Sequence, residues 1–354
     1  MSEREALLDK AARLAKRYLD GVGERPVGAT VADGELQRRL GGPLPETGQD
    51  GDEVLEALAA AARDGTVATQ GPRFFGFVVG SSLPVATAAD WLVSGWDQNS
   101  GLHILSPLNA AIEEVTGDWI RAIVGLPGSW TAGYVTGGSM ANFTALAAAR
   151  RHTLKAAGWD VEADGLYGAP PIRFLVTEES HYSIATSLRM LGLGMNGAVR
   201  IGTDAQGRMR MDELQSVLKK IRGPCVVCAQ AGNVNTGAFD ALERVAALAR
   251  EHGAWLHVDG AFGLWAAASP DLAPLLAGIE EADSISTDAH KWLNVPYDCG
   301  IVLCAHARAH RGAMTLAAAY LQESPRERDP REYVPEESRR ARAVPVYAAL
   351  RSLG

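Results

Sequence analysis

The sequence has little cysteine, no long hydrophobic run and no excess of positive charge. Its 354 residues include four cysteines, too few for a disulfide scaffold in a chain of this length. No stretch reaches the roughly 20 uncharged apolar residues that a membrane span needs, because the best candidate, residues 254–279, is interrupted by Asp259 and Pro270. Lysine and arginine number 34 against 42 aspartates and glutamates, a net charge of −8. This balance argues against a nucleic-acid binder, which usually carries a basic patch.

Targeting signals and metal motifs are also missing. Residues 1–20 carry charges throughout and have the pattern of an amphipathic helix, not of a signal peptide. The eight histidines occur without H-E-x-x-H spacing. Cys225 and Cys228 are spaced C-x-x-C, but they fall within a predicted strand, where residues three apart point to opposite faces. We therefore expect no metal site. A composition of 47% hydrophobic and 21% charged residues is ordinary for a soluble globular protein, so the expected class is a cytoplasmic enzyme.

What the chain does contain is an alternation of strands and helices after a helical start. The first 70 residues have helical patterns, interrupted by the loop at residues 41–45. Strands are predicted at residues 133–136, 172–177, 198–202, 225–230, 254–259, 284–287 and 300–304. Helices are predicted at residues 139–157, 182–191, 212–222 and 240–252, the last with Asp240 and Glu243 at capping-box spacing. This alternation predicts an α/β fold with a mainly parallel sheet sandwiched by helices.

Domain boundaries follow from the same patterns. We expect a helical N-terminal segment over residues 1–75 and a large cofactor-binding domain over residues 76–322. Residues 324–337 are charged and punctuated by proline, which predicts a mobile loop or linker, with helix resuming near Ser338. The region 323–354 is therefore expected to hold this loop and the start of a further domain.

Glycine and polar residues follow nearly every predicted strand. Residues 137–142 follow the first strand, and His181 follows the second. Residues 259–261 end the fifth strand, and residues 288–291 follow the sixth. Ligands of open α/β sheets bind beyond the carboxyl ends of the strands. We therefore expect these residues to line one pocket.

Each of these residues also has a purely structural interpretation. Residues 137–139 can form a simple tight turn, and the dinucleotide fingerprint G-x-G-x-x-G is absent. His181 alone is more often a hydrogen-bonded structural histidine, and a single lysine such as Lys291 is most often solvated. Lys291, however, directly follows a buried-type strand and precedes Trp292. Asp259 ends a hydrophobic strand and must be paired or hydrogen-bonded, because burying an unpaired charge is costly.

Together the groups meet the requirements of one cofactor, pyridoxal phosphate. A glycine turn at a helix N-terminus can hold its phosphate. A neutral lysine amine can form a Schiff base with its aldehyde. A carboxylate can pair with its protonated pyridine nitrogen and keep the ring an electron sink, and an imidazole can stack on the ring. The sequence therefore predicts pyridoxal phosphate as the cofactor.

At these residues the chain resembles the group II pyridoxal-phosphate-dependent decarboxylases, which include aromatic amino acid, tyrosine and glutamate decarboxylases. The resemblance runs from about Phe75 to the C-terminus. It is carried by five motifs in order: residues 136–142 (TGGSMAN), 180–183 (SHYS), 237–240 (GAFD), 257–263 (HVDGAFG) and 283–292 (DSISTDAHKW). Jointly they are highly specific, and the last is the strongest.

The resemblance implies a role for each candidate residue. Lys291 is the Schiff-base lysine, Asp259 pairs with the pyridine nitrogen, Ala261 packs against the ring and His181 stacks on its other face. Tyr320 stands at the position of a loop tyrosine that helps to return a proton after carbon dioxide leaves. The phosphate-binding region includes these residues: Gly138, Ser139, Met140, Asp288 and His290.

The resemblance also implies an architecture. It indicates the aspartate-aminotransferase-like fold, the large domain of fold type I, with a helical N-terminal segment. Members of the family form homodimers whose N-terminal helices embrace the partner, and the helical first 70 residues agree with this. Residues 337–342 match a family segment that normally leads into a C-terminal domain, whereas this sequence stops at Gly354.

Three positions depart from the family pattern. Residues 229–236 (AQAGNVNT) stand where the family often has threonines that contact cofactor or substrate. Asp288 stands where an asparagine is common, which puts a negative charge near the phosphate. Gly260 replaces a common alanine.

These observations predict a decarboxylase that converts an L-amino acid to its amine and carbon dioxide. Two alternatives remain: another carbon–carbon lyase or aldehyde-forming enzyme on the same fold, and an inactive truncated member. Related aldehyde synthases change the loop tyrosine or the stacking histidine, and the presence of both Tyr320 and His181 favours decarboxylation. The expected partners are an amino-acid substrate and a second copy of the chain, with no nucleic acid and no membrane.

Overall fold

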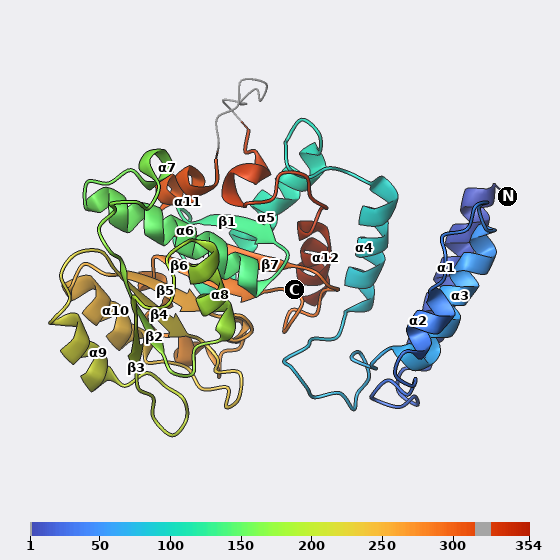
Figure 1. Ribbon diagram of the computed structural model, residues 1–354, viewed down its shortest axis with the longest axis horizontal. Coiled ribbons are helices and arrows are strands. Elements are labelled where there is room, and N and C mark those ends of the chain that lie inside the picture. The colour runs from blue at the N-terminus through green and yellow to red at the C-terminus, as the bar shows by residue number, and fades with distance from the viewer. Residues whose placement is uncertain (1, 316–326) are drawn as a thin grey trace. The chain divides into compact units, whose positions relative to one another are not determined.

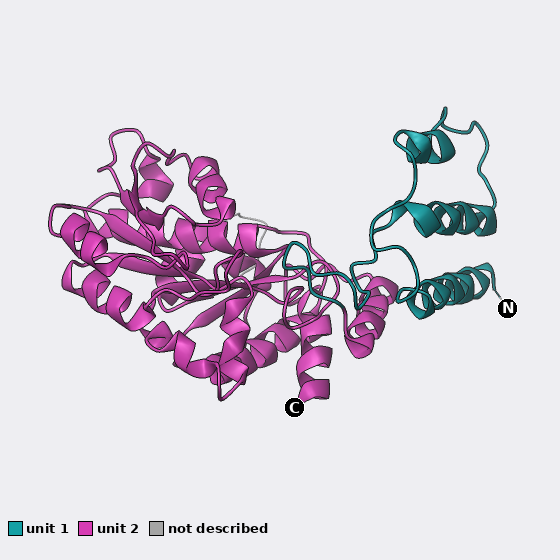
Figure 2. Cartoon of the chain, turned by 90° about the horizontal axis from the view of Figure 1, so that it is seen from below, with its two compact units in different colours: residues 1–81 teal, residues 82–354 magenta. Residues whose placement is uncertain are grey.

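The chain forms two compact units, residues 1–81 and residues 82–354 (Figures 1 and 2). The computed structural model describes residues 2–315 and 327–354. Within these residues no helix combines the length and the hydropathy that crossing a membrane requires.

The first unit consists of helices α1 (Glu3–Asp20), α2 (Glu35–Leu40) and α3 (Gly51–Gly65). Ser2 caps α1 in a capping box with Glu5, and the side chain of Asp50 caps α3, so both helices begin where a side-chain oxygen meets their first free N–H groups. Lys10 of α1 forms an ion pair with Asp52 of α3. The first unit is thus helical, with three separate helices.

The second unit contains a seven-stranded sheet. Its strands are β1 (Thr131–Val135), β2 (Arg173–Thr177), β3 (Ala198–Ile201), β4 (Cys225–Gln230), β5 (Trp255–Asp259), β6 (Ser284–Asp288) and β7 (Gly300–Cys304). They lie in the order β1-β7-β6-β5-β4-β2-β3. Only β7 runs against its neighbours, β1 and β6, so the other six strands are parallel. The mainly parallel sheet predicted from the alternation of strands and helices is confirmed.

Helices accompany the strands along the chain. They are α4 (Pro84–Trp96), α5 (Pro107–Val124), α6 (Gly138–Ala156), α7 (Val161–Asp164), α8 (Tyr182–Met190), α9 (Met211–Leu218), α10 (Leu242–Glu251), α11 (Ala307–Met314) and α12 (Ala343–Leu353). Short 3₁₀ helices occupy Gly263–Ala268, Ala273–Leu276, Ile279–Glu281 and Pro330–Tyr333.

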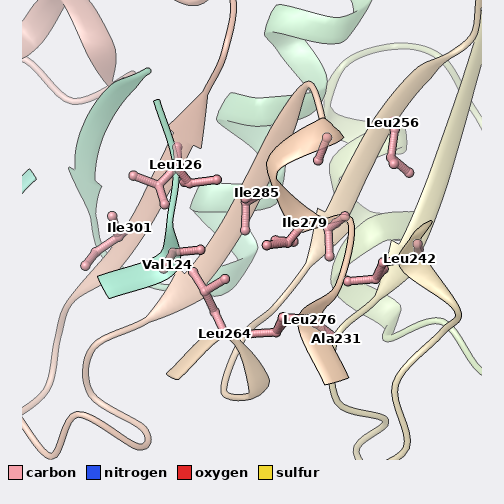
Figure 3. Packing of buried hydrophobic residues seen from close by; sticks show 14 of the residues in the cluster. Val124, Leu126, Ala231, Leu242, Leu256, Leu264, Leu276, Ile279, Ile285 and Ile301 are labelled. Atoms are coloured by element: carbon pink, nitrogen blue, oxygen red, sulfur yellow. The ribbon is translucent and has the colours of Figure 1, made fainter. Parts of the chain in front are cut away.

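Both faces of the sheet are buried, which fixes the alternation of its side chains. In β4, Val227 belongs to one hydrophobic cluster and Val226 to another, because successive strand residues point to opposite faces. Cys225 and Cys228 likewise fall in different clusters and are free thiols, as expected for residues three apart. Figure 3 shows part of the larger cluster, in which side chains from β5, β6 and β7 pack together. Each fully buried Leu, Ile or Val contributes about 1.5–3 kcal/mol.

Helix α6 lies close to the sheet because its inner face is made of small residues. Ala141, Ala145 and Ala148 are fully buried, and alanine is also the best helix former. A Cβ added at Gly300, the first residue of β7, would lie 2.5 Å from the Cα of Gly137. The start of α6 is therefore pressed against the sheet at its carboxyl edge, where the candidate site lies.

Two local predictions need correction. Asp240 does not cap α10: the N-cap residue is Ala241, without a side-chain hydrogen bond. The Asp240 carboxylate instead accepts from the backbone N–H groups of Met209 and Gln230, each at 2.7 Å. The C-terminal helix begins at Ala343, five residues after the predicted Ser338.

The stretch from 324 to 337 is described from residue 327 onward. There Pro330–Tyr333 form a 3₁₀ turn, and Arg331 and Glu332 are buried. A Cβ added at Gly133 of β1 would lie 2.5 Å from the carbonyl oxygen of Tyr333. This segment therefore packs on a face of β1, the strand at one end of the sheet.

Candidate active site

Asp259 and Asp288 end the neighbouring parallel strands β5 and β6. Both lie at the carboxyl edge of the sheet, and the glycine turn that precedes α6 follows β1 at the same edge. The topology thus brings together residues more than a hundred positions apart in the sequence, as ligand sites of α/β sheets require.

Asp259 is buried, with an exposed fraction of 5%. Its carboxylate accepts hydrogen bonds from Asn142 Nδ2 at 3.0 Å and from the backbone N–H of Ala261 at 3.1 Å. Both donors are neutral amides, so the carboxylate is held in place with its negative charge uncompensated by them. Because a buried charge is stable only when it is paired or well hydrogen-bonded, a cation that binds here would pair favourably with the Asp259 carboxylate.

A chain of hydrogen bonds runs through the sheet to Asp259. Trp255 Nε1 donates to Ser284 Oγ at 2.9 Å, and Ser284 Oγ lies 3.0 Å from His257 Nδ1. His257 Nε2 lies 2.9 Å from Asn142 Oδ1. Burial lowers the pKa of His257 to about 4, so the ring is neutral at neutral pH and carries its proton on Nε2, facing the amide oxygen. Each bond then donates toward Asp259, and such chains polarise one another.

Asn142 and His257 were not assigned a role from the sequence. The signal was present, because both lie inside motifs already singled out. Asn142 is on α6, four residues after Gly138, and so one helical turn from the glycine turn. His257 precedes Asp259 by two positions and therefore shares its face of β5. The sequence alone does not predict the hydrogen bond between the two side chains.

His181 is the N-cap residue of α8. Its Nδ1 accepts from the backbone N–H of Ser183 at 3.3 Å and lies 2.7 Å from Ser183 Oγ. The pKa of His181 is lowered chiefly by burial and further by Lys291, while the negative charges of Asp259 and Asp288 act to raise it. His181 is therefore within electrostatic range of all three side chains.

Lys291 follows β6 and points back to the end of that strand. Its Nζ lies 2.9 Å from Asp288 Oδ2, and its side chain is 20% exposed. His290 is buried, accepts from the backbone N–H of Cys299 at 3.1 Å, and stacks on the ring of Tyr297. Burial lowers the pKa of His290, and Asp288 acts in the opposite direction.

The glycine turn lies against Asp288. A Cβ added at Gly138 would lie 2.8 Å from Asp288 Oδ2, and a Cβ added at Gly137 would lie 3.2 Å from His290 Cε1. Neither position therefore leaves room for a side chain. Helix α6 begins here without a side-chain cap. Its first N–H groups, including those of Ser139 and Met140, are therefore open to an anion.

Of the remaining predicted residues, Ala261 lies at this edge, where its backbone oxygen accepts from the N–H of Asp288 at 2.8 Å. Tyr320 lies outside the described residues. The unusual Gln230 does not turn toward Lys291: its Nε2 donates to Thr177 Oγ1 and to the backbone oxygen of Glu179, so it links the ends of β4 and β2. Among the described residues, no group of three or more His, Cys, Asp or Glu side chains could hold a metal ion.

A separate cavity of about 280 Å³ lies at the opposite, amino edge of the sheet. It is lined at the starts of β4 and β5, and by His152 and Asp283. Asp283 accepts from the backbone N–H of Leu256 at 2.7 Å and lies 2.6 Å from His306 Nε2. Asp283 and Asp288 thus sit at the two ends of the same strand.

Comparison with known proteins agrees with this geometry. A family model described as the pyridoxal-dependent decarboxylase conserved domain matches residues 34–354. An aromatic-L-amino-acid decarboxylase of Bacillus atrophaeus is 32% identical over 311 residues, which cover 87% of this chain and 62% of that protein. The human cysteine sulfinic acid decarboxylase is 31% identical over 276 residues, which cover 76% of this chain and 54% of that protein. The chain thus spans less than two thirds of the length of these relatives.

Solved structures show the same fold. The crystal structure of mouse CSAD in apo form has a TM-score of 0.91 and 26% identity, and covers 99% of this chain and 74% of that chain. The structure of Oryza sativa TDC with PLP and tryptamine has a TM-score of 0.92 at 24% identity, with the same coverage. The predicted family, fold and cofactor are confirmed by these matches: the chain belongs to the pyridoxal-dependent decarboxylase family.

Proposed function

We propose that this chain decarboxylates an L-amino acid to its amine and carbon dioxide, with pyridoxal phosphate bound at the carboxyl edge of the sheet. The observation that carries the proposal is the placement of Asp259 at the end of β5 and of Lys291 just after the adjacent strand β6, with the open N-terminus of α6 at the same edge. The names of the relatives, an aromatic-L-amino-acid decarboxylase and a cysteine sulfinic acid decarboxylase, support the same reaction class.

The residues present fit the cofactor at three points. The buried carboxylate of Asp259, hydrogen-bonded by neutral amides, suits a protonated pyridine nitrogen. The glycine turn and uncapped start of α6 suit a phosphate. Lys291 supplies an amine at 20% exposure, which a bound aldehyde can reach. One feature fits less well, the carboxylate of Asp288 against the same turn.

When bound, pyridoxal phosphate supplies an electron sink that stabilises the negative charge left on the α-carbon as carbon dioxide departs. Asp259 holds the proton on the ring nitrogen by its negative charge, and the hydrogen-bond chain through Asn142 and His257 fixes that carboxylate. His181 presents a neutral ring to the site, because its pKa is lowered. With Nδ1 accepting from Ser183, its proton lies on Nε2, the atom that can donate. We assign the return of a proton to the α-carbon to Tyr320, assisted by His181.

The cofactor assignment is tested by absorbance. The purified protein with added pyridoxal phosphate should develop a visible absorbance band, and Lys291→Ala should abolish it while the protein stays folded. Lys155→Ala, at an exposed position of α6, is the matched control and should keep the band. A wild-type protein that stays colourless with excess cofactor would sink the proposal.

The reaction is tested by product analysis. A panel of amino acids, aromatic and acidic, should yield carbon dioxide and the matching amine in equal amounts for at least one member. Aldehyde formation in place of the amine would establish the alternative, an aldehyde-forming enzyme. Tyr320→Phe should divert products toward the aldehyde if the loop tyrosine returns the proton. No product from any member, despite bound cofactor, would indicate an inactive member.

We further propose that the protein works as a homodimer in the cytoplasm. Helix α4 exposes four large apolar side chains, Val85, Trp91, Leu92 and Trp96, and exposed apolar surface can form an interaction site. Light scattering should give twice the 37.5 kDa of one chain. Leu92→Glu should shift the mass toward the monomer, and Leu272→Glu, at an exposed leucine elsewhere, should not. The four free thiols suit a reducing compartment, which cell fractionation can test.

A further inference from the structure

A carboxylate lies where the cofactor's phosphate is expected to bind. Asp288 is 2% exposed, and its Oδ2 is 2.8 Å from the Cβ position of Gly138, the first residue of α6. Its other oxygen, Oδ1, is buried without a hydrogen-bond partner. The N–H groups at the start of α6 that would attract a phosphate therefore face a group of the same sign.

The charges around Asp288 come from several elements. Lys291 Nζ lies 2.9 Å from Oδ2 and His290 Nε2 lies 3.5 Å from Oδ1. The charge of Asp288 also acts on His181 at the start of α8, on the hydroxyl of Tyr297 and on the thiol of Cys299. Lys291 is the basic side chain that forms the ion pair with Asp288, whereas burial lowers the pKa values of both histidines.

A phosphate dianion added here meets an unfavourable balance. Asp288 and Lys291 cancel each other, so the dianion has only the partial positive charge of the α6 N-terminus. A second like charge in a buried site strongly favours protonation of one of the groups. The group in reach is the Asp288 carboxylate, whose Oδ1 lies 3.5 Å from Nε2 of His290.

We propose that the Asp288 carboxyl group takes up one proton from solvent when a dianionic phosphate binds at the N-terminus of α6. The carboxyl group then changes from a charge of −1 to 0 and carries the added proton itself, because His290 accepts at Nδ1 from the Cys299 N–H and already has its ring proton on Nε2. Phosphate binding is consequently tighter at lower pH and weakens as pH rises. This inference rests on the proposed function, since it concerns the same cofactor site, and it makes Asp288 the residue that sets the pH dependence of cofactor retention.

Sulfate is the probe that isolates the effect, because it stays a dianion throughout the neutral range and carries no aldehyde. The full 354-residue chain is freed of cofactor, and sulfate affinity is measured at constant ionic strength. In the wild type, affinity should fall by up to about tenfold per pH unit between about pH 6 and about pH 8. Calorimetry in buffers of different ionisation heat should give one proton taken up for each sulfate bound.

Asp288→Asn removes the charge and keeps the shape. It should bind sulfate at least about tenfold more tightly near pH 8, with little pH dependence and no proton uptake. Asp283→Asn, at the other end of β6, is the matched control and should keep the wild-type pH dependence. If Asp288→Asn does not fold, Asp288→Ala is measured in its place, with the same expected result.

Three outcomes overturn the inference: a wild-type sulfate affinity independent of pH, the same slope in Asp288→Asn, or no sulfate binding in any of the proteins. These outcomes are distinct from a failure of the proposed function. A protein that forms the visible band through Lys291 and releases carbon dioxide, yet binds sulfate equally well at every pH, refutes only the role of Asp288.

Discussion

At the scale of single residues, the site depends on the side-chain amide of Asn142, which both donates and accepts hydrogen bonds. Asn142 Nδ2 donates to Asp259 and to Ser183 Oγ, while Asn142 Oδ1 accepts from Ser286 Oγ and faces His257. The hydrogen bonds fix the orientation of the amide, because exchanging its nitrogen and oxygen would turn an acceptor toward the Asp259 carboxylate. Asn142 is therefore a positioning residue for the carboxylate, although it has no titratable group of its own.

Asn142→Ala should weaken both the fold and cofactor binding. It leaves buried partners unsatisfied, which should lower the free energy of unfolding by about 1–3 kcal/mol, and pyridoxal phosphate affinity should fall by about tenfold. Urea unfolding and cofactor titration measure the two effects. Asn235→Ala, at an exposed position, should change neither. Unaltered cofactor affinity in Asn142→Ala would rule out the positioning role.

Two buried histidines make stability depend on pH. Burial lowers the pKa of His257 and of His310 from 6.5 to about 4. Between these values the unfolded chain binds more protons than the folded chain, so stability is lost as pH falls from about 6.5 toward about 4. Each histidine contributes up to about 1.4 kcal/mol per pH unit. Urea unfolding across this range should show the loss, and His310→Gln should reduce its slope. An unchanged slope in that variant would contradict the assignment.

At the scale of elements, the glycine turn is shaped by β7 as much as by α6. A Cβ on Gly300 would lie 2.4 Å from the carbonyl carbon of Gly137, closer than atoms can approach. Gly300→Ala should therefore displace the turn and lower cofactor affinity by about tenfold or more, with a loss of stability of about 1–3 kcal/mol. Gly128→Ala, where a Cβ meets nothing within 4 Å, is the control for cofactor titration and urea unfolding. Wild-type affinity in Gly300→Ala would show that the turn does not carry the site.

The outer edge of β1 is closed by a buried ion network. Glu113 of α5 pairs with Arg328 at 2.9 Å and with Arg339 at 2.5 Å. Arg339 also donates to the backbone oxygen of Tyr134, and Arg328 to that of Ala132. Carbonyl groups that β1 would otherwise expose at the sheet edge are thereby satisfied, as edge strands require.

Glu113→Gln should be severely destabilising, because it leaves two guanidinium charges buried without their carboxylate. A loss of about 3–5 kcal/mol is expected in urea unfolding. Glu281→Gln breaks the exposed pair with Arg250 and should cost at most about 1 kcal/mol. Similar losses in the two variants would mean that the buried network adds no more than a surface pair.

The sequence predicted the elements best where local pattern and burial agree. The bounds of β4 and β7 match the predicted runs residue for residue, since continuous apolar runs between turn residues leave little freedom. The N-cap predicted at Asp240 is wrong. The spacing of Asp240 to Glu243 fits a capping box, but two backbone N–H groups distant in the sequence donate to the same carboxylate. The hydrogen bond between His257 and Asn142 could not be predicted for the same reason. It joins β5 to α6 through tertiary packing, which no local sequence pattern encodes.

At the scale of the whole molecule, the two units differ in how much they bury. In residues 2–81 only Lys10, Ala61 and Ala68 are buried, whereas residues 82–354 hold the sheet and both of its faces. Every described residue of the candidate site belongs to the second unit. A helical unit with so little core of its own has low local stability.

Limited proteolysis should therefore cut first within residues 1–81 and leave a resistant fragment beginning near Ser82. If the proposed homodimer covers the first unit, the rate of that cut should fall as protein concentration rises. Mass spectrometry of the early fragments gives the order of cleavage. A first cut between residues 131 and 304, inside the sheet region, would contradict the assignment of stability to the second unit.

The antiparallel strand β7 has a consequence for how the protein is made. Because β7 begins at the carboxyl edge, its first residue, Gly300, forms the support against which Gly137 rests, and Lys291 is made only shortly before it. A growing chain on the ribosome thus holds the start of α6 long before it holds the surface that shapes it. The cofactor can be captured only after most of the polypeptide has emerged, so that a prematurely ended product lacking β7 would draw nothing from the cell's pool of pyridoxal phosphate.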